Sequence, residues 1–305
     1  MTSKKILVIG SSNTDMSVKS IKLPKPGETV LGDDFRMGPG GKGANQAVAA
    51  RRLGGGVSFI CKLGKDMFGE KALEHYRSCG LDVSRILYSD KPSGIALITV
   101  DSLAENSIVV ASGANADITP EDIDASADII RSAGMLLLQL EIPMPAVVRA
   151  AEIAHESGVK VVLNPAPATK LPEELLRCVS ILIPNETEAS AISGIDITDL
   201  KTAGKAANLL KSKGVREIII TMGSRGSVVC DGETTFIPAR KVNAVDTTAA
   251  GDTFCGGVCV ALSEGKDIYD AVRFATVASS IAVQRPGAQD SVPSRQEVDY
   301  IMNNN

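Results

Sequence analysis

Two aspartates, Asp246 and Asp252, flank a run of small residues in "NAVDTTAAGDTFCGG" (residues 243–257), and a helical pattern follows directly. The start of a helix carries about half a positive charge and several unpaired N–H groups, so it attracts anions. The small side chains at 249–251 would let a phosphate approach those N–H groups. Asp252 therefore indicates one of two things: ordinary helix electrostatics, or a carboxylate that faces an acceptor hydroxyl while the amides hold a transferring phosphoryl group.

The segment "GSSNTD" (residues 10–15) follows the first apolar run, and its Asn13 and Asp15 lie two residues apart. This spacing puts both side chains on one side of an extended segment. Open parallel sheets bind ligands at the carboxyl ends of their strands, and an amide beside a carboxylate suits sugar hydroxyls, which both donate and accept. The pattern predicts either a sugar-binding pair or a plain polar loop.

A glycine-rich loop, "GPGGKGANQ" (residues 38–46), opens the next helical pattern and carries Lys42 and Asn45. Gly43 breaks the Walker phosphate-loop pattern, and the segment after the first strand lacks the GxGxxG spacing of a dinucleotide site. The loop predicts either a tight turn that only packs or a polar-ligand site at a helix start. The nearby Asn13 and Asp15 favour binding.

Two further segments follow expected strands and suit a nucleotide. In "PNETE" (residues 184–188), Asn185 and Glu188 are three apart and would share one face of a short helix. A carboxylate and an amide near phosphates can hold the water shell of Mg²⁺. In "TMGSRG" (residues 221–226), the glycines permit a close approach of the backbone to a ligand.

Apolar runs alternate with helix-period segments, which is typical of a parallel sheet covered by helices on both faces. We expect strands at 5–10, 57–64, 135–141, 159–164, 181–185 and 215–223, and helices at 42–54, 67–80, 145–158, 202–214, 249–265 and 268–283. Residues 13–40 and 93–112 show turn residues and short alternation instead. They predict antiparallel pieces that pair into a small sheet projecting from the main body.

The composition excludes several classes of protein. The 305-residue chain is 44% hydrophobic and carries a net charge of −4, so the basic excess of a nucleic-acid binder is missing. The apolar stretch at 135–140 is far below the roughly 18 residues that cross a bilayer, and Ile6–Ile9 is too short for a signal peptide. We therefore expect a cytoplasmic protein with no nucleic-acid or membrane partner. The six scattered cysteines are interpreted as buried free thiols, and His75 and His155 as surface histidines.

Together, these segments resemble the ribokinases of the PfkB-type carbohydrate kinase family. "GGKGANQAVAA" resembles the first signature of that family and "DTTAAGDTF" the second, while "NPAPA", "PNETEA", "TMGSRG" and "GAQDSVP" resemble further segments in the expected order. The resemblance implies one ribokinase-like domain over 1–305, with a doubly wound, mainly parallel sheet sandwiched by helices and a small antiparallel β lid at about 13–40 and 93–112. It also implies ATP-dependent phosphorylation of D-ribose at the 5-hydroxyl, giving D-ribose 5-phosphate and ADP.

The resemblance further implies a role for each matching residue. Asp252 matches the catalytic base, and the anion hole is matched by Ala249, Ala250 and Gly251. The sugar contacts are matched by Asn13, Asp15, Gly41, Lys42, Asn45 and Glu141. The nucleotide contacts are matched by Asn185, Thr221, Gly223, Ser224, Gly226 and Gly251, with Glu188 on the magnesium side. The site of an activating monovalent cation, usually K⁺, is matched by Asp246, Thr248, Ala282, Arg285, Gly287 and Ser291.

Two departures from the family pattern leave the preferred pentose open: Ala249 stands where the family often has glycine, and "FRMGP" before the sugar loop is unusual. The alternatives are a kinase for 2-deoxyribose, fructose or a nucleoside, and a non-catalytic sugar- or nucleotide-binding regulator. Asp252 and its intact anion-hole segment favour an enzyme. The edges of the expected lid strands also predict a homodimer in which two lids pair, a prediction taken partly from the family.

Overall fold

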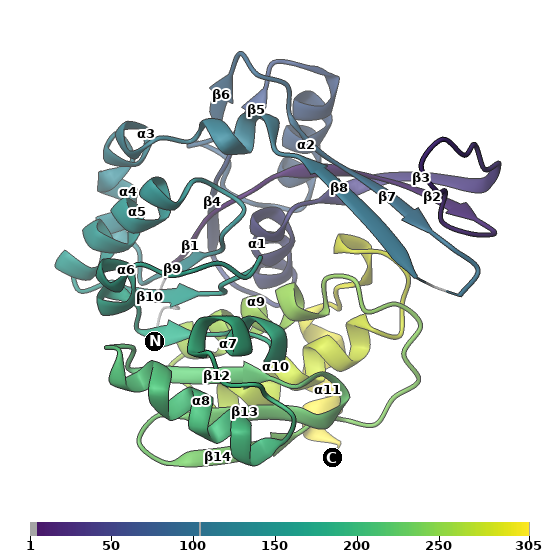
Figure 1. Cartoon of the computed structure of the whole chain (residues 1–305). Helices are drawn as coiled ribbons and strands as arrows, with labels where there is room; N and C mark the ends of the chain where they lie inside the picture. Colours follow the sequence, from purple (N-terminus) through teal and green to yellow (C-terminus); the bar gives the residue numbers. More distant parts are fainter. Residues whose placement is uncertain (1–4, 104, 305) are drawn as a thin grey trace.

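The computed structural model describes residues 5–103 and 105–304, and its main element is an eight-stranded sheet of order β14-β13-β12-β11-β10-β9-β1-β4 (Figure 1). Strands from β4 to β12 pair in parallel, and β13 and β14 are antiparallel at one edge. The strands span Ile6–Ile9 (β1), Val57–Ile60 (β4), Met135–Leu138 (β9), Lys160–Leu163 (β10), Ile181–Leu182 (β11), Glu217–Thr221 (β12), Gly226–Cys230 (β13) and Thr234–Pro238 (β14).

The central strands are apolar on both faces because both faces are covered. In β1, Leu7 and Ile9 pack into one hydrophobic core, and Ile6 and Val8 pack into a second core on the opposite face. Successive side chains of a strand point to opposite sides, so a strand buried on both sides needs an unbroken apolar run. Burial on both faces therefore explains the unbroken apolar run from which β1 was predicted.

Two layers of helices cover the sheet (Figure 1). One core is shared with α3 (Pro120–Asp124), α4 (Ala127–Ser132), α5 (Met144–Glu156), α6 (Glu173–Cys178), α7 (Glu186–Ser193) and α8 (Leu200–Ser212). The other core is shared with α1 (Lys42–Arg52), α2 (Met67–Ser78), α9 (Ala250–Ser263), α10 (Ile268–Ala282) and α11 (Arg295–Asn303). The expectation of a doubly wound, mainly parallel sheet between helices is confirmed.

Two details differ from the expected elements. The expected strand at 57–64 is two strands, because the chain leaves the main sheet after β4 and β5 (Lys62–Gly64) pairs with β6 (Leu87–Ser89) in a separate two-stranded sheet. The antiparallel strands β13 and β14, which end the sheet on one side, were also not expected. Their sequence "GSVVCDGETTFIP" forms a hairpin that follows β12 with only the short 3-10 turn Gly223–Arg225 in between.

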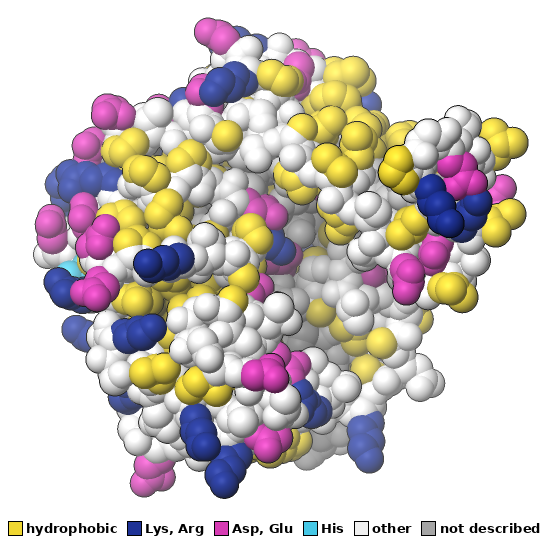
Figure 2. Space-filling model, viewed as in Figure 1, with side chains coloured by type: hydrophobic (Ala, Val, Ile, Leu, Met, Phe, Trp, Pro, Cys, Tyr) yellow, Lys and Arg dark blue, Asp and Glu magenta, His cyan; other side chains and the backbone are white. Residues whose placement is uncertain are grey.

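A second, four-stranded sheet of order β3-β2-β7-β8 projects from the main body (Figure 1). It consists of β2 (Asn13–Ser20), β3 (Gly32–Gly40), β7 (Gly94–Val100) and β8 (Asn106–Ala111). The outer pairs are antiparallel as expected, but the central β2–β7 pair is parallel, so the expectation of a wholly antiparallel sheet is wrong. Residue 104, within one of the segments expected to form the lid, lies outside the described residues. Figure 2 shows the molecule hollowed between this sheet and the main body, with acidic and basic side chains in the hollow.

Five of the cysteines are buried, Cys79 is half-buried, and all six thiols are free. His155 is exposed, but the interpretation of His75 as a surface residue is wrong: its ring is half-buried and bonded to Gln289. Over the described part of the chain, no helix combines the length and the apolar character that crossing a bilayer requires.

Candidate active site

Polar side chains gather at the carboxyl ends of neighbouring parallel strands. Asn13 follows β1, Glu141 follows β9, Asn164 follows β10, and Asn185 follows β11, while Thr221 ends β12. In the main sheet, β1 lies between β4 on one side and β9 on the other. Strands that follow β1 in the chain are thus added on opposite sides of it, so the strand order reverses at β1. An open parallel sheet forms its ligand crevice at such a point. Four of the predicted site residues, Asn13, Glu141, Asn185 and Thr221, therefore lie at this crevice.

Asp252 lies in the first turn of α9, and its side chain is buried. Its Oδ2 accepts a hydrogen bond of 3.0 Å from Asn45 Nδ2, and its Oδ1 accepts one of 2.9 Å from Gln46 Nε2. Ala249, directly before the helix, has a φ of 56°, a left-handed conformation that is uncommon for a residue with a side chain. The helix therefore starts without a side-chain cap, and of its first amides that of Ala250 donates to Thr247 O at 3.2 Å.

Burial raises the pKa of Asp252 above that of an ordinary aspartate, although Lys42 and the bonds from Asn45 and Gln46 lower it. Burial also acts on Lys42, whose pKa it lowers, but the carboxylates of Asp252, Glu141 and Glu188 outweigh that effect and leave the pKa above its ordinary value. Lys42 is thus a charged group held among three carboxylates. It can stabilise negative charge that develops beside Asp252.

Glu141 holds the loop that carries Lys42. Its Oε2 accepts hydrogen bonds from the Lys42 main-chain N at 2.9 Å and from Ser11 Oγ at 2.5 Å. The loop can come this close because Gly41 has a φ of 87°, and a Cβ there would lie 2.8 Å from the main-chain N of Asn13. Gly41 is therefore a geometric requirement of the glycine-rich loop at 38–46.

Asn13 and Asp15 lie on β2, beside this loop. Asn13 is buried, and its Oδ1 accepts a 2.8 Å hydrogen bond from Asn115 Nδ2, a residue that the sequence did not predict. Because its oxygen is engaged, Asn13 presents its NH₂ group to other partners. Burial, Glu141 and Asp252 raise the pKa of Asp15 to about 6, although Lys42 lowers it. The folded protein therefore holds Asp15 as an anion at a cost in stability.

This cost predicts the effect of Asp15→Asn. The pKa of Asp15 is about 6 in the folded state against the ordinary 3.8, so the folded state binds the proton more tightly. This tighter proton binding stabilises the folded state in full below pH 3.8, and the stabilisation is lost as the pH rises through about 6. We expect Asp15→Asn to be more stable than the parent by about 1–3 kcal/mol at neutral pH. Calorimetry across pH measures this, and equal melting temperatures at neutral pH would contradict it.

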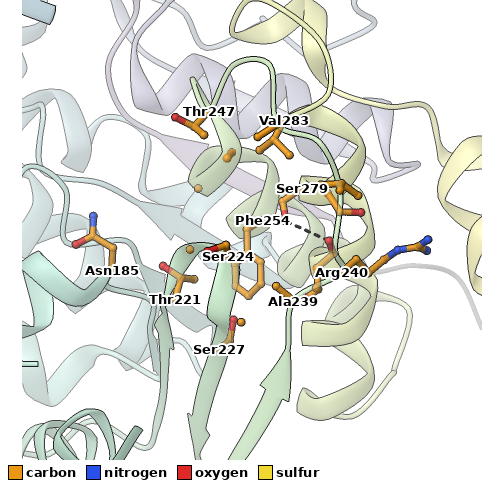
Figure 3. A pocket seen from close by; sticks show the side chains of 18 of the residues that line it. Asn185, Thr221, Ser224, Ser227, Ala239, Arg240, Thr247, Phe254, Ser279 and Val283 are labelled. Carbon is orange, nitrogen blue, oxygen red and sulfur yellow. Dashed lines mark hydrogen bonds between the residues drawn. The ribbon is translucent and has the colours of Figure 1, made fainter. Parts of the chain in front are cut away.

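The larger of two adjoining cavities, about 650 Å³, lies between the β12–β13 hairpin and the start of α9. All six predicted nucleotide residues line it, namely Asn185, Thr221, Gly223, Ser224, Gly226 and Gly251. Figure 3 shows Phe254 among Thr221, Ser224 and Ser227, with the Arg240 side chain extending away from them. The sequence did not predict the apolar wall formed by Phe254 and Val283. A pocket of this size, apolar with a few polar groups, suits a nucleotide.

The smaller cavity, about 210 Å³, is lined by Lys42, Asp252, Asn185 and Glu188. Ala250 and Gly251 line both cavities. The start of α9 is therefore the wall that the two cavities share. A group bound in one cavity and a group bound in the other would meet at the start of this helix and at Asp252.

Glu188, predicted on the magnesium side, is buried and bonded to Asn185. Its Oε2 accepts from the Asn185 main-chain N at 2.9 Å, and Asn185 Oδ1 accepts in return from the Glu188 main-chain N at 2.8 Å, which forms the capping box of α7. Within residues 5–103 and 105–304, no three His, Cys, Asp or Glu side chains form a metal-binding group. A divalent ion here would need ligands from phosphates and water, as Mg²⁺ commonly does.

The six residues predicted for a monovalent cation lie on the loop before α9 and on the end of α10 with the loop that follows it. The carboxylate of Asp246 accepts from the main-chain N of Thr248 and of Gly287, each at 2.9 Å, and so ties the two segments together. Burial raises the pKa of Asp246, but these bonds outweigh it and leave the pKa below the ordinary value. Arg285 directs its guanidinium to Glu297 instead.

Two glutamines near Asp252 were not assigned a role from the sequence. Gln46 Nε2 donates to Asn164 Oδ1 at 3.0 Å as well as to Asp252, and Gln46 Oε1 accepts from Gln139 Nε2 at 2.6 Å. Both glutamines are fully buried. Gln46 ends the loop segment "GPGGKGANQ", and a glutamine on the apolar face of a helix was the only signal that could have pointed to it.

Comparisons with known proteins agree with this geometry. Residues 3–295 match the pfkB family of carbohydrate kinases. The chain is 44% identical to the ribokinase of Haemophilus influenzae over 96% of this chain and 97% of that one, and 35% identical to the deoxyribokinase of Salmonella typhi over 98% and 99%. The solved structure of Arabidopsis thaliana ribokinase complexed with ribose and ATP superposes with a TM-score of 0.93 at 34% identity, covering 99% of both chains. The chain thus belongs to the pfkB family of carbohydrate kinases.

Proposed function

We propose that this protein transfers the γ-phosphoryl group of ATP to the 5-hydroxyl of D-ribose, giving D-ribose 5-phosphate and ADP. The observation that carries the proposal is the start of α9. Its uncapped amides form the wall between the two cavities, and Asp252 lies in that wall beside Lys42. The larger cavity takes ATP, and ribose lies against Asn13, Asp15 and Asn45 on the other side of the helix start.

Asp252 accepts the proton of the 5-hydroxyl while the ribose oxygen bonds to the γ-phosphorus and the bond from that phosphorus to the β,γ-bridging oxygen breaks. Phosphoryl transfer passes through a loose transition state, so positioning and charge stabilisation contribute more than strong base catalysis. The amide of Gly251 stabilises the phosphoryl oxygens, the Ala250 amide being bonded to Thr247 O, and Lys42 adds a positive charge. The buried partners Asn45 and Gln46 hold the carboxylate in place.

Two ions complete the proposal. Mg²⁺, arriving with ATP, neutralises phosphate charge, and Glu188 and Asn185 would hold its water shell. K⁺ would lie between the two segments tied by Asp246 and Gly287, where main-chain carbonyls and the Asp246 carboxylate suit a monovalent cation. Since that loop leads directly into α9, cation binding would set the position of the helix start.

The four-stranded sheet is proposed to act as a lid and as a dimer interface. It projects beside the hollow in Figure 2 and carries exposed apolar side chains, among them Leu31, Phe35, Leu97 and Val109. An exposed apolar sheet with free edges favours pairing with a second copy. Closure of the lid would exclude water, which would otherwise accept the phosphoryl group. Sedimentation that gives a stable monomer at working concentration would contradict the dimer.

A sugar panel tests the reaction. ADP release is measured with D-ribose, 2-deoxy-D-ribose, D-fructose and a nucleoside, with and without K⁺, and the product is identified by NMR. We expect the highest kcat/KM for D-ribose, phosphate on O5, and a higher rate with K⁺. A preference for 2-deoxyribose, as the similarity to a deoxyribokinase allows, would move the assignment to that substrate. ADP release that no sugar stimulates would contradict the kinase proposal.

A further inference from the structure

A chain of hydrogen bonds leads from Asp252 away from both cavities to His75 on α2. Asn45 Nδ2 donates to Asp252 Oδ2 at 3.0 Å, and Gln289 Nε2 donates to Asn45 Oδ1 at 3.0 Å. His75 Nε2 lies 2.8 Å from Gln289 Oε1. Asn45 and Gln289 are buried, and Gln289 lies in the short helical turn Gln289–Ser291 after α10. Four separate segments of the chain, α9, α1, the turn Gln289–Ser291 and α2, are therefore joined end to end.

The direction of every bond in this chain is fixed by the carboxylate. An ionised aspartate can only accept hydrogen bonds, so Asn45 must turn its NH₂ group toward Asp252. The carbonyl of Asn45 then points the other way and needs a donor, which is the NH₂ group of Gln289. The carbonyl of Gln289 in turn needs a donor, and the Nε2–H of His75 supplies it. Reversing any one member would bring two like groups together.

We propose that Gln289 and His75 are positioning residues that fix the orientation of Asn45 and, through it, the carboxylate of Asp252. Neither Gln289 nor His75 lines the two cavities described above, so their effect passes through Asn45. The inference rests on the proposed function, because it concerns the orientation of the proposed base. An amide held from one side only can rotate, and a displacement of about 1 Å at a reacting group costs on the order of a hundredfold in rate.

The surroundings of His75 support its role as the donor. Its Nε2 is also 3.5 Å from the thiol sulfur of Cys79, one turn along α2. Contact with Cys79, the bond to Gln289 and the charge of Asp290 raise the pKa of His75, while burial lowers it. A raised pKa favours the protonated ring, in which Nε2 carries a hydrogen that Gln289 Oε1 can accept.

Gln289→Glu tests the proposal most directly, because it keeps the size and shape of the side chain. The new carboxylate still accepts from His75, but it cannot donate to Asn45. We expect kcat to fall by about tenfold to a hundredfold and the KM for ribose to rise, with the KM for ATP unchanged. Gln289→Met, which has no charge and no donor, should act in the same direction. The matched control is Gln296→Glu, the same change at an exposed position of α11, which should behave as the parent.

A double-mutant cycle separates positioning from general damage. If Gln289 acts through Asn45, Gln289→Glu in an Asn45→Ala background should change kcat by less than about twofold. His75→Phe should lower kcat, and His75→Gln, which keeps an N–H donor, should restore most of it. Full kcat in Gln289→Glu, or losses that multiply in the double variant, would overturn the proposal. Asp252→Asn assayed in parallel distinguishes the two failures: if that variant keeps its turnover, the proposed base is wrong whatever Gln289 does.

Discussion

Asp252→Asn is expected to lower kcat by about two to four orders of magnitude while leaving the binding of ribose and ATP close to that of the parent. The substitution keeps the size of the side chain but removes the carboxylate that is proposed to take the hydroxyl proton. The cavities and the amides at the start of α9 are unchanged, so positioning and charge stabilisation of the phosphoryl group remain. This residual contribution is why the expected loss is not total.

Steady-state kinetics gives kcat, and titration calorimetry gives the two dissociation constants. The melting temperature must be measured as well, because the new NH₂ group would face the NH₂ group of Asn45 or Gln46, both of which donate to the parent carboxylate. A folded variant that turns over at near the parent rate would remove Asp252 from the role of base.

Lys42→Met is expected to lower kcat/KM by about two to three orders of magnitude. Lys42 is the charge that offsets Asp252, Glu141 and Glu188, so its loss leaves three carboxylates without compensation beside an incoming polyphosphate. Lys42 also lowers the pKa of Asp252. The acid side of the pH–rate profile should therefore move to higher pH in the variant, since Asp252 must be ionised to accept the proton.

The control for this experiment is Lys65→Met, at an exposed lysine paired with an exposed Asp90. A surface pair of this kind contributes about 0–1 kcal/mol to stability, so the control should keep the activity and pH profile of the parent. A pH profile of Lys42→Met that coincides with the parent profile would show that Lys42 does not act on Asp252.

The parts of the fold and site that local sequence determines were predicted well. Apolar runs predicted the central strands correctly because these strands are buried on both faces. The small residues before Asp252 predicted a helix that starts without a side-chain cap. The hairpin β13–β14 was missed because β14 is a mostly exposed edge strand, and β13, although buried, offers only a short apolar run after glycine and serine. Pairing of Asp252 with Gln46 was missed because the two lie 206 positions apart, and no local spacing encodes such a contact.

The surroundings of His75 show the same limit. A lone histidine in a helical pattern is most often exposed, and the sequence around it is indeed polar. Its burial follows from the packing of the turn that carries Gln289, which comes from near the end of the chain. The role of such a residue depends on what another segment brings to it, so it becomes visible only in three dimensions.

The partners of Asp252 also bear on how the protein is made. Asn45 and Gln46 lie in the first sixth of the chain, whereas α9 lies in the last fifth. During translation, the two amide side chains are therefore made long before Asp252, the carboxylate to which they donate. Until then, the amides of a nascent chain have no anion to bind, and burying them would leave donors unsatisfied. Synthesis of α9 should therefore both complete the hydrophobic core beneath it and supply the carboxylate proposed for phosphoryl transfer. A truncated translation product that ends before α9 would lack both part of the hydrophobic core and the proposed base.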